Sequence, residues 1–139
     1  MAMVASAVAN GGKLMKPRLV EKVVDPDGRT VKSYGPSEEA TVMSEQAAGQ
    51  LGDMMTKVVQ SGTGTAAALQ GIQVAGKTGT AEVANGAANQ AWFIAFAPVK
   101  NPKVAIAVTV ERTQQSLTGG EVAAPIAKQV MQALLREGG

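Results

Sequence analysis

The sequence of 139 residues contains no cysteine and no histidine. Without cysteine the chain has no disulfide, thiol nucleophile or thiolate metal site. Without histidine it has neither a serine–histidine triad nor an ordinary zinc site. We therefore expect no metal and no cofactor. A nucleophilic enzyme of this composition would need Lys, Asp, Glu or Tyr as its base.

The sequence also has few aromatic residues and a small net charge. Aromatics make up 3% of the chain, and 13 basic residues face 11 acidic ones, for a net charge of +2. With no Lys/Arg run and few rings to stack on bases, nothing predicts a nucleic-acid partner. No apolar run approaches the roughly 18 residues of a membrane span. If the protein is exported, its export signal lies outside this sequence. The length suits one domain, with a core of Ala, Val, Leu, Ile and Met.

Hydrophobic periodicity predicts a helix in three places. The first opens at Met1 without a capping residue and stops at Asn10-Gly11-Gly12, as a helix cut from a longer protein would. The second is capped by Ser44 and ends at Ser61-Gly62. The third runs from Glu121 to Glu137, with Pro125 near its start. The second helix has the apolar stripe Ala47, Ala48, Leu51, Met54, Met55, Val58 and Val59, and the third has Val122, Ile126, Ala127, Val130, Met131 and Leu134.

Extended segments are predicted between these helices. Two short strands, Arg18–Val24 and Arg29–Tyr34, flank an Asp-Pro-Asp-Gly turn at 25–28. Residues 72–80 are expected to be extended, and Ala91–Ala97 and Val104–Val110 to form an antiparallel hairpin. Because the hairpin strands are apolar on both faces, helices must cover the sheet. The fold class predicted is therefore α/β (α+β), an antiparallel sheet covered by helices.

The segment Gly71–Thr78 matches the phosphate-loop pattern G-x-x-x-x-G-K-[ST] in every position. Such a loop leaves a buried strand and runs directly into a helix whose N-terminus holds the anion. Here the preceding residues 65–70 are Ala-rich, and residues 79–90 contain Gly79, Asn85, Gly86 and Asn89. That composition leaves room for one helical turn at most. A nucleotide-binding protein is thus the less favoured alternative.

The same lysine also opens the motif Lys77-Thr78-Gly79-Thr80. On a strand, this motif places a cation near a nucleophile or a carboxylate. Its two hydroxyls can bind an anion, its glycine admits another backbone, and the last amide can stabilise an oxyanion. A plain strand with an exposed lysine is the competing interpretation of these four residues alone.

The chain resembles class B penicillin-binding proteins over nearly its whole length, and within them the penicillin-binding protein A subgroup. Each matching piece is weak alone, but their order and spacing are specific. In order, the pieces are Met1-Ala2-Met3-Val4, Ala9-Asn10-Gly11-Gly12, Val58-Val59 with Gly62-Thr63-Gly64-Thr65-Ala66, Gly76-Lys77-Thr78-Gly79-Thr80-Ala81 and Trp92-Phe93-Ile94-Ala95. The resemblance implies the fold of a penicillin-binding transpeptidase or serine β-lactamase-like domain.

Of the family's three motifs, S-x-x-K, S-x-N and K-[ST]-G, only the third is present. None of the six serines has Lys three residues on or Asn two residues on: Ser6, Ser33, Ser37, Ser44, Ser61 and Ser116. We therefore expect residues 1–139 to be the C-terminal portion of a single transpeptidase domain. The nucleophile would lie on an N-terminal portion absent from this chain, and the chain alone would be inactive.

The resemblance also implies a reaction, in which a serine attacks a D-Ala-D-Ala stem peptide and an amine of a second stem peptide resolves the acyl-enzyme. Lys77 and Thr80 would be catalytic, the lysine bonded to the S-x-N serine and the Thr80 amide in the oxyanion hole. Thr78, Gly79 and Thr80 would bind the substrate or a β-lactam. A non-catalytic β-lactam sensor or degenerate relative is the alternative.

Further expectations follow from the resemblance alone. The partners would be the stem peptide, β-lactams, the upstream part of the same domain and a membrane glycan polymerase. The protein would lie at the extracytoplasmic face of the bacterial membrane, tethered by an N-terminal segment not in this chain, and would act in cell-wall synthesis during growth or division. Two expectations come from the residues themselves: Trp92, the single tryptophan, belongs to the sheet core, and the Gly62–Thr65 turn is structural.

Overall fold

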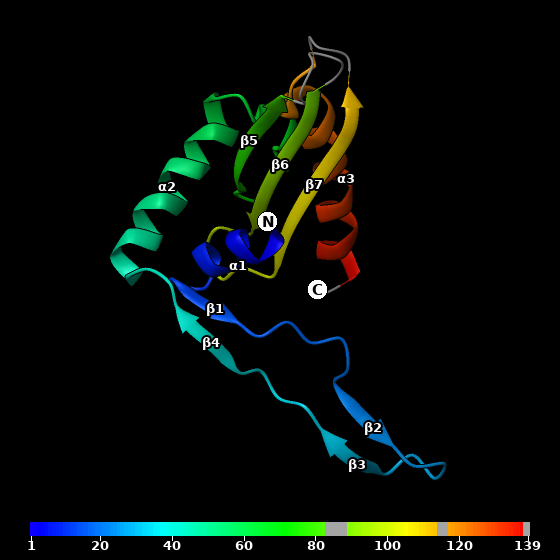
Figure 1. The fold of residues 1–139 in the computed structure, drawn as a ribbon. Helices are drawn as coiled ribbons and strands as arrows, with labels where there is room; N and C mark the ends of the chain where they lie inside the picture. Colours follow the sequence, from blue (N-terminus) through cyan, green and yellow to red (C-terminus); the bar gives the residue numbers. More distant parts are fainter. Residues whose placement is uncertain (83–88, 114–116, 138–139) are drawn as a thin grey trace.

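An antiparallel sheet forms the centre of the protein (Figure 1). A computed structural model describes residues 1–82, 89–113 and 117–137. Its sheet contains β5 (Ala75–Glu82), β6 (Asn89–Ala97) and β7 (Val104–Thr113) in the order β5-β6-β7. The pairing of β6 with β7 confirms the predicted antiparallel hairpin. Within the described residues β5 is an edge strand, because its only sheet partner is β6.

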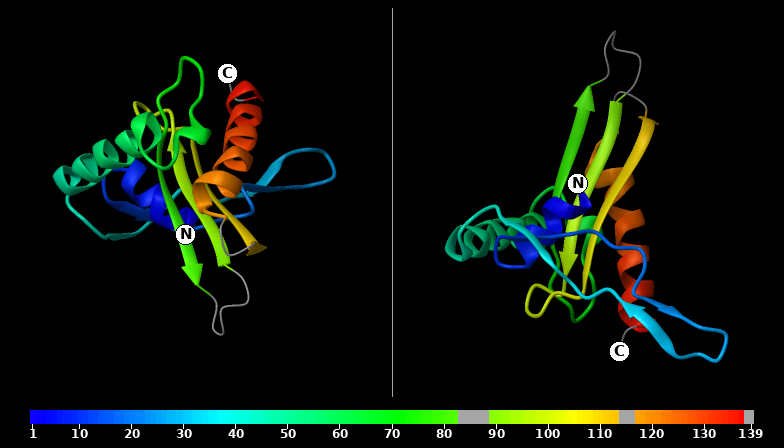
Figure 2. Two further views of the ribbon diagram at one scale, coloured as in Figure 1. Left: turned by 90° about the horizontal axis from the view of Figure 1, so that it is seen from above. Right: turned by 60° about the horizontal axis from the view of Figure 1, so that its bottom comes forward.

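Helices cover both faces of this sheet, as the apolar pattern of its strands requires. The last helix, α3 (Gly119–Glu137), packs on β6 and β7 from one side. The first, α1 (Ala2–Ala9), packs on the same two strands from the other side, and α2 (Glu45–Ser61) flanks β5. Two further views show this layering and the oblique angle between the helices (Figure 2). The predicted fold class is confirmed.

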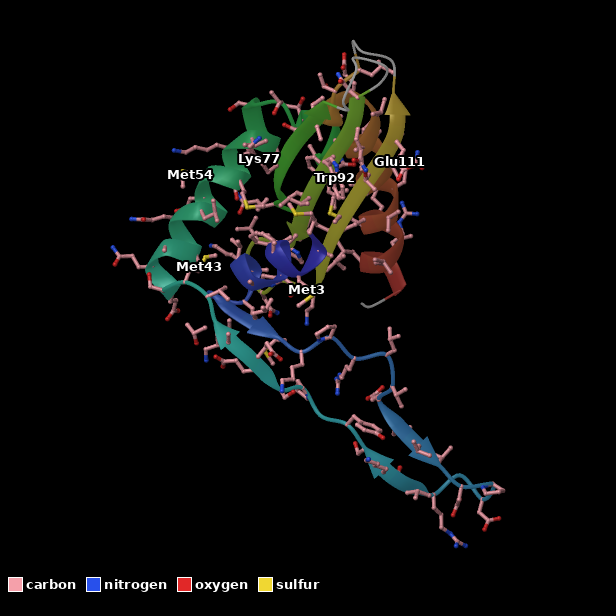
Figure 3. The ribbon with its side chains drawn as sticks, in the orientation of Figure 1. Met3, Met43, Met54, Lys77, Trp92 and Glu111 are labelled. Carbon is pink, nitrogen blue, oxygen red and sulfur yellow. The ribbon has the colours of Figure 1, made fainter. Side chains whose placement is uncertain are left out.

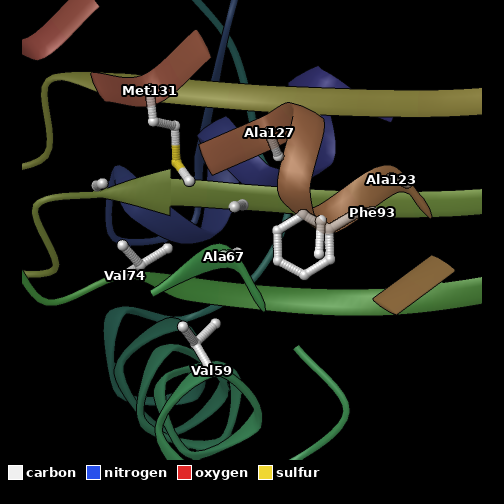
Figure 4. Close-up of a cluster of buried hydrophobic side chains, with 10 residues drawn as sticks. Val59, Ala67, Val74, Phe93, Ala123, Ala127 and Met131 are labelled. Atoms are coloured by element: carbon white, nitrogen blue, oxygen red, sulfur yellow. The ribbon is translucent and has the colours of Figure 1, made fainter. Parts of the chain in front are cut away.

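The side chains between α3 and the sheet form the larger buried cluster (Figure 4). Phe93 and Met131 are its largest fully buried members. Gly76 makes room for the Phe93 ring, because a Cβ at position 76 would lie 2.5 Å from its Cζ. A smaller cluster on the opposite face joins α1, α2 and the sheet through Val8, Met55, Ala75 and Phe96.

The buried face of α3 differs from the predicted stripe. Ala127 and Met131 are buried as expected, but Ile126, Val130 and Leu134 are exposed. Small residues set the orientation, since Ala123, Ala124 and Ala127 let the helix lie close to the sheet. The helix also begins at Gly119 rather than Glu121, so that Pro125 lies inside it.

The predicted cap and length of α2 are confirmed, while its stripe is narrower than expected. The Ser44 hydroxyl accepts a hydrogen bond of 3.2 Å from the amide of Ala47. Met55 is buried, but Met54 is 57% exposed and Ala47 is also exposed. The buried residues lie three or four apart, as on one face of a helix, with one adjacent pair: Ala48, Gly52, Met55, Thr56 and Val59.

Between α1 and α2 the chain makes a long excursion, which we call the arm (residues 16–37). At its base β1 (Lys13–Met15) pairs with β4 (Glu38–Thr41), and neither strand was predicted from the sequence. Further out β2 (Lys22–Val24) pairs with β3 (Thr30–Ser33), and both are shorter than the predicted strands. The predicted turn between them is confirmed, with Gly28 at φ 80° and the Asp25 carboxylate accepting from the Arg29 amide at 2.8 Å.

The arm points away from the rest of the protein and has no core of its own (Figure 1). Every residue of β2 and β3 is exposed. No helix in the described ranges is both long and apolar enough to cross a membrane.

Candidate active site

The Lys77–Thr80 motif lies in the middle of β5, on the edge strand of the sheet. This placement excludes the phosphate loop, because β5 continues as a strand to Glu82, so that Thr78 is not followed directly by a helix. The extended segment expected over 72–80 is thus shifted, beginning at Ala75. Lys77 and Thr78 therefore present their side chains from a strand.

Successive residues of the motif point to opposite faces of the sheet. Lys77 and Gly79 pair with Ile94 and Trp92, on the side that α1 and α2 cover. Thr78 and Thr80 pair with Phe93 and Ala91, on the side of α3. The strand thus offers a cation on one face and two hydroxyls on the other.

Lys77 is exposed, and its side chain follows the strand. Its Nζ donates a hydrogen bond of 2.6 Å to the carbonyl oxygen of Thr78. Figure 3 shows Lys77 between α2 and β5. An ammonium group held at an exposed edge is available to a serine or an anion brought to that edge.

Thr78 is the best-fixed side chain of the motif. Its Oγ1 lies 2.8 Å from the Oγ1 of Thr63, in the turn after α2. Its Cγ2 faces the start of α3, where a Cβ at Gly120 would lie 3.5 Å away. Thr63 was not among the site residues predicted from the sequence, because its turn was expected to be purely structural. The position of Thr63 between Gly62 and Gly64, directly after a helix, is the sequence feature that could have indicated a role for it.

Gly79 and Thr80 complete the exposed part of the motif. A Cβ at Gly79 would lie 3.3 Å from the Cβ of Trp92, so a side chain there would press on the tryptophan. Trp92 itself is partly buried opposite Gly79 and belongs to neither buried cluster, so the structure does not place it in the sheet core as predicted. Thr80 is exposed.

The N-terminus of α3 is pressed against the same part of the sheet. A Cβ at Gly119 would lie 2.0 Å from the Trp92 carbonyl oxygen and 2.7 Å from that of Gly79, so only glycine fits. The Glu121 carboxylate accepts from the amide and the hydroxyl of Thr118, at 2.8 and 2.9 Å. These two hydrogen bonds lower the pKa of Glu121 below its ordinary value, and the bond from the Thr118 amide has the larger effect.

Two pockets of the described structure lie away from the motif. One, of about 290 Å³, is enclosed by α2, Leu69 and Ile72 near the beginning of β5. Another, of about 440 Å³, lies between α1 and the connection from β6 to β7. Neither is lined by Lys77 or Thr80, whose edge of the sheet is open to solvent.

Comparison with known proteins identifies the family. Residues 1–132 match the penicillin binding protein transpeptidase domain. The chain therefore belongs to this family, which confirms the resemblance seen in the sequence. It is 44% identical to the peptidoglycan D,D-transpeptidase PbpA of Mycolicibacterium smegmatis, over 99% of this chain and 29% of that protein.

Solved structures agree with this assignment. The D,D-transpeptidase domain of a peptidoglycan glycosyltransferase from Eggerthella lenta superposes with a TM-score of 0.85 at 40% identity, covering 99% of this chain and 31% of that one. Penicillin-binding protein A of M. tuberculosis, as its penicillin G acyl-enzyme complex, gives 0.86 at 38% identity, covering 96% and 31%. The chain thus spans less than a third of each of these three relatives.

Proposed function

We propose that residues 1–139 form the C-terminal portion of a serine D,D-transpeptidase domain that cross-links peptidoglycan stem peptides and is acylated by β-lactams. One observation carries the proposal: the motif Lys77-Thr78-Gly79-Thr80 lies on β5, the edge strand of the described sheet. The chain that contains it matches the transpeptidase family over residues 1–132. Relatives of 38% identity or more include a D,D-transpeptidase and a penicillin G acyl-enzyme.

In this proposal each residue of the motif has a role that its position permits. Lys77 is an exposed cation that bonds to the S-x-N serine. The hydroxyls of Thr78 and Thr80, on one face of β5, hold the carboxylate of the substrate or drug. The Thr80 amide stabilises the oxyanion together with the amide of the nucleophile. Gly79 admits the substrate strand beside it.

The nucleophile must come from the upstream part of the domain, since no serine of this chain carries an S-x-x-K motif. We therefore expect this chain alone to be inactive. Incubation with a fluorescent penicillin tests this directly. A covalent label is expected on the protein that contains both portions, and none on residues 1–139 alone. If the protein with both portions is never labelled, the proposal is wrong.

Variants of the longer protein test the motif itself. Thr80→Ala should slow acylation without lowering the melting temperature, since Thr80 is exposed. Lys77→Met should nearly abolish acylation, while Lys103→Met, which removes an exposed lysine of the β6–β7 connection, should not. Unchanged acylation by Thr80→Ala would remove Thr80 from the site. Labelling without any stem-peptide cross-linking would instead favour a non-catalytic β-lactam sensor.

The family resemblance also supports a location and a partner. We propose that the protein acts at the extracytoplasmic face of the membrane, tethered by a segment outside this chain, beside a membrane glycan polymerase. Fractionation of cells and co-purification of the full-length protein would test the two statements separately. Recovery of the full-length protein in the cytoplasmic fraction would contradict the first.

A further inference from the structure

Thr63 lies in a closely packed turn, between Gly62 and Gly64, directly after α2. The amides of Gly62 and Gly64 both donate to the carbonyl oxygen of Val58, at 3.1 and 3.0 Å. A Cβ at Gly62 would lie 2.9 Å from that oxygen, and one at Gly64 would lie 3.1 Å from the ring of Phe93. The turn is therefore closely packed, and the position of Thr63 is fixed relative to α2 and the sheet.

From this turn Thr63 reaches the motif strand. Its Oγ1 lies 2.8 Å from the Oγ1 of Thr78. The start of α3 completes the contact, since a Cβ at Gly120 would lie 2.2 Å from the Thr63 carbonyl oxygen and 3.5 Å from the Cγ2 of Thr78. Both branches of the Thr78 side chain are thus set by segments outside β5, namely its hydroxyl by Thr63 and its methyl group by α3.

The chemistry of the two hydroxyls indicates which of them donates the proton in the bond between Thr63 and Thr78. A threonine hydroxyl has one proton to donate and can also accept. If Thr78 gave its proton to Thr63, it could not donate to a ligand. Thr78 can donate to a carboxylate only while it accepts from Thr63. A bond accepted from Thr63 also polarises the Thr78 hydroxyl and strengthens the bond that it donates.

We infer that Thr63 is a positioning residue, which donates to Thr78 and so leaves the Thr78 proton free for the carboxylate of the substrate or β-lactam. The inference rests on the proposed function, because it assumes that Thr78 binds a carboxylate. It adds a residue from outside the K-T-G-T motif to the recognition of that carboxylate.

The test compares two ligands in the longer protein that contains both portions of the domain. The second-order rate constant of acylation is measured with penicillin G and with its methyl ester, which lacks the carboxylate charge. Thr63→Val should slow acylation by penicillin G by roughly fivefold, the effect of one net hydrogen bond. The rate with the ester should stay the same, and Thr63→Ser should restore the wild-type ratio of the two rates.

The matched control is Thr65→Val, which changes an exposed threonine of the same turn and should leave both rates unchanged. Because each ratio is measured within one variant, a partly unfolded preparation does not alter it. In a Thr78→Val background, Thr63→Val should have no further effect on the ratio.

Three results would overturn the inference. Equal slowing with both ligands would show a general structural role, and unchanged rates with both ligands in Thr63→Val would show no role in carboxylate recognition. A loss of the ratio that Thr63→Ser fails to restore would show that the hydroxyl is not what matters. If the wild-type protein is not acylated by either ligand, the proposed function fails as well, which distinguishes that failure from the others.

Discussion

The body of the protein, formed by the β5–β6–β7 sheet with α1, α2 and α3, contrasts with the arm. In the body, Phe93 and Met131 are fully buried, and Gly119 brings a helix into contact with the sheet backbone. In the arm, Leu19 is fully exposed, and a Cβ added at Gly35 would meet no atom within 4 Å. The motif residues Lys77–Thr80 belong to the close-packed region, so their geometry is set by contacts that the arm lacks.

The largest difference between the two regions is expected for removal of an apolar side chain. Met131→Ala should lower the free energy of unfolding by about 3 kcal/mol, because it leaves a cavity in the larger cluster. Leu19→Ala, at a fully exposed position of the arm, should change it by less than about 0.5 kcal/mol. Denaturant unfolding measures both. Similar losses for the two variants would show that the arm is packed in solution.

A smaller effect is expected where a methyl group is added. Gly119→Ala should destabilise the protein by about 2 kcal/mol, since its Cβ would lie 2.0 Å from the Trp92 carbonyl oxygen and force α3 away. Gly35→Ala, at an open position of the arm, should be nearly neutral. The same unfolding experiment applies. A neutral Gly119→Ala would mean that the start of α3 does not lie against the sheet.

A still smaller effect is expected in how the free energy of unfolding depends on pH, through Glu121 in the first turn of α3. Because the pKa of Glu121 is lower in the folded protein, its contribution to stability is present above the pKa of an unfolded glutamate. That contribution is lost as the pH falls through the lowered value. Glu121→Gln should therefore flatten the acid limb of a stability–pH curve. Glu21→Gln, at an exposed position of the arm, serves as the control, and equal curves for the two variants would contradict the hydrogen bonds between Glu121 and Thr118.

The smallest effect is expected from removing the outer part of the arm. Replacing residues 18–34 with a short Gly-Ser linker should leave the melting temperature of the body unchanged, because β2 and β3 pair only with each other in the sheets described. An isolated two-stranded ribbon adds little stability by itself. A clear fall in melting temperature would reveal support that the arm gives to the body.

The elements predicted best from the sequence are those whose pattern is strong over many residues. The sequence predicts the β6–β7 hairpin because each strand is apolar on both faces. It predicts α2 because Ser44 is a good N-terminal cap in front of an apolar stripe. The resemblance to the family rested on ordered motifs rather than on any single one. Chemistry at the motif was expected because a lysine, two hydroxyls and a glycine occur together in a segment that does not continue into a helix.

Other features depended on contacts between distant residues, which local patterns do not contain. Ile126, Val130 and Leu134 have the spacing of a buried stripe, but the small side chains of α3 determined which face lies on the sheet. The strands β1 and β4 form only because each meets the other across the arm. The contact of Thr63 with Thr78 joins two segments fifteen residues apart through hydroxyls that could equally have faced water.

The alternation of side chains along β5 explains why the motif has a fixed spacing. A single residue inserted after Gly76 would carry Lys77 to the α3 side and Thr78 to the α1 side, because side chains in a strand repeat every two residues. The cation and the hydroxyl would then exchange surroundings while the strand itself could still form. An insertion in this edge would therefore disrupt the motif, whereas residues added at the 25–28 turn, between the exposed strands β2 and β3 of the arm, would change no contact of the body.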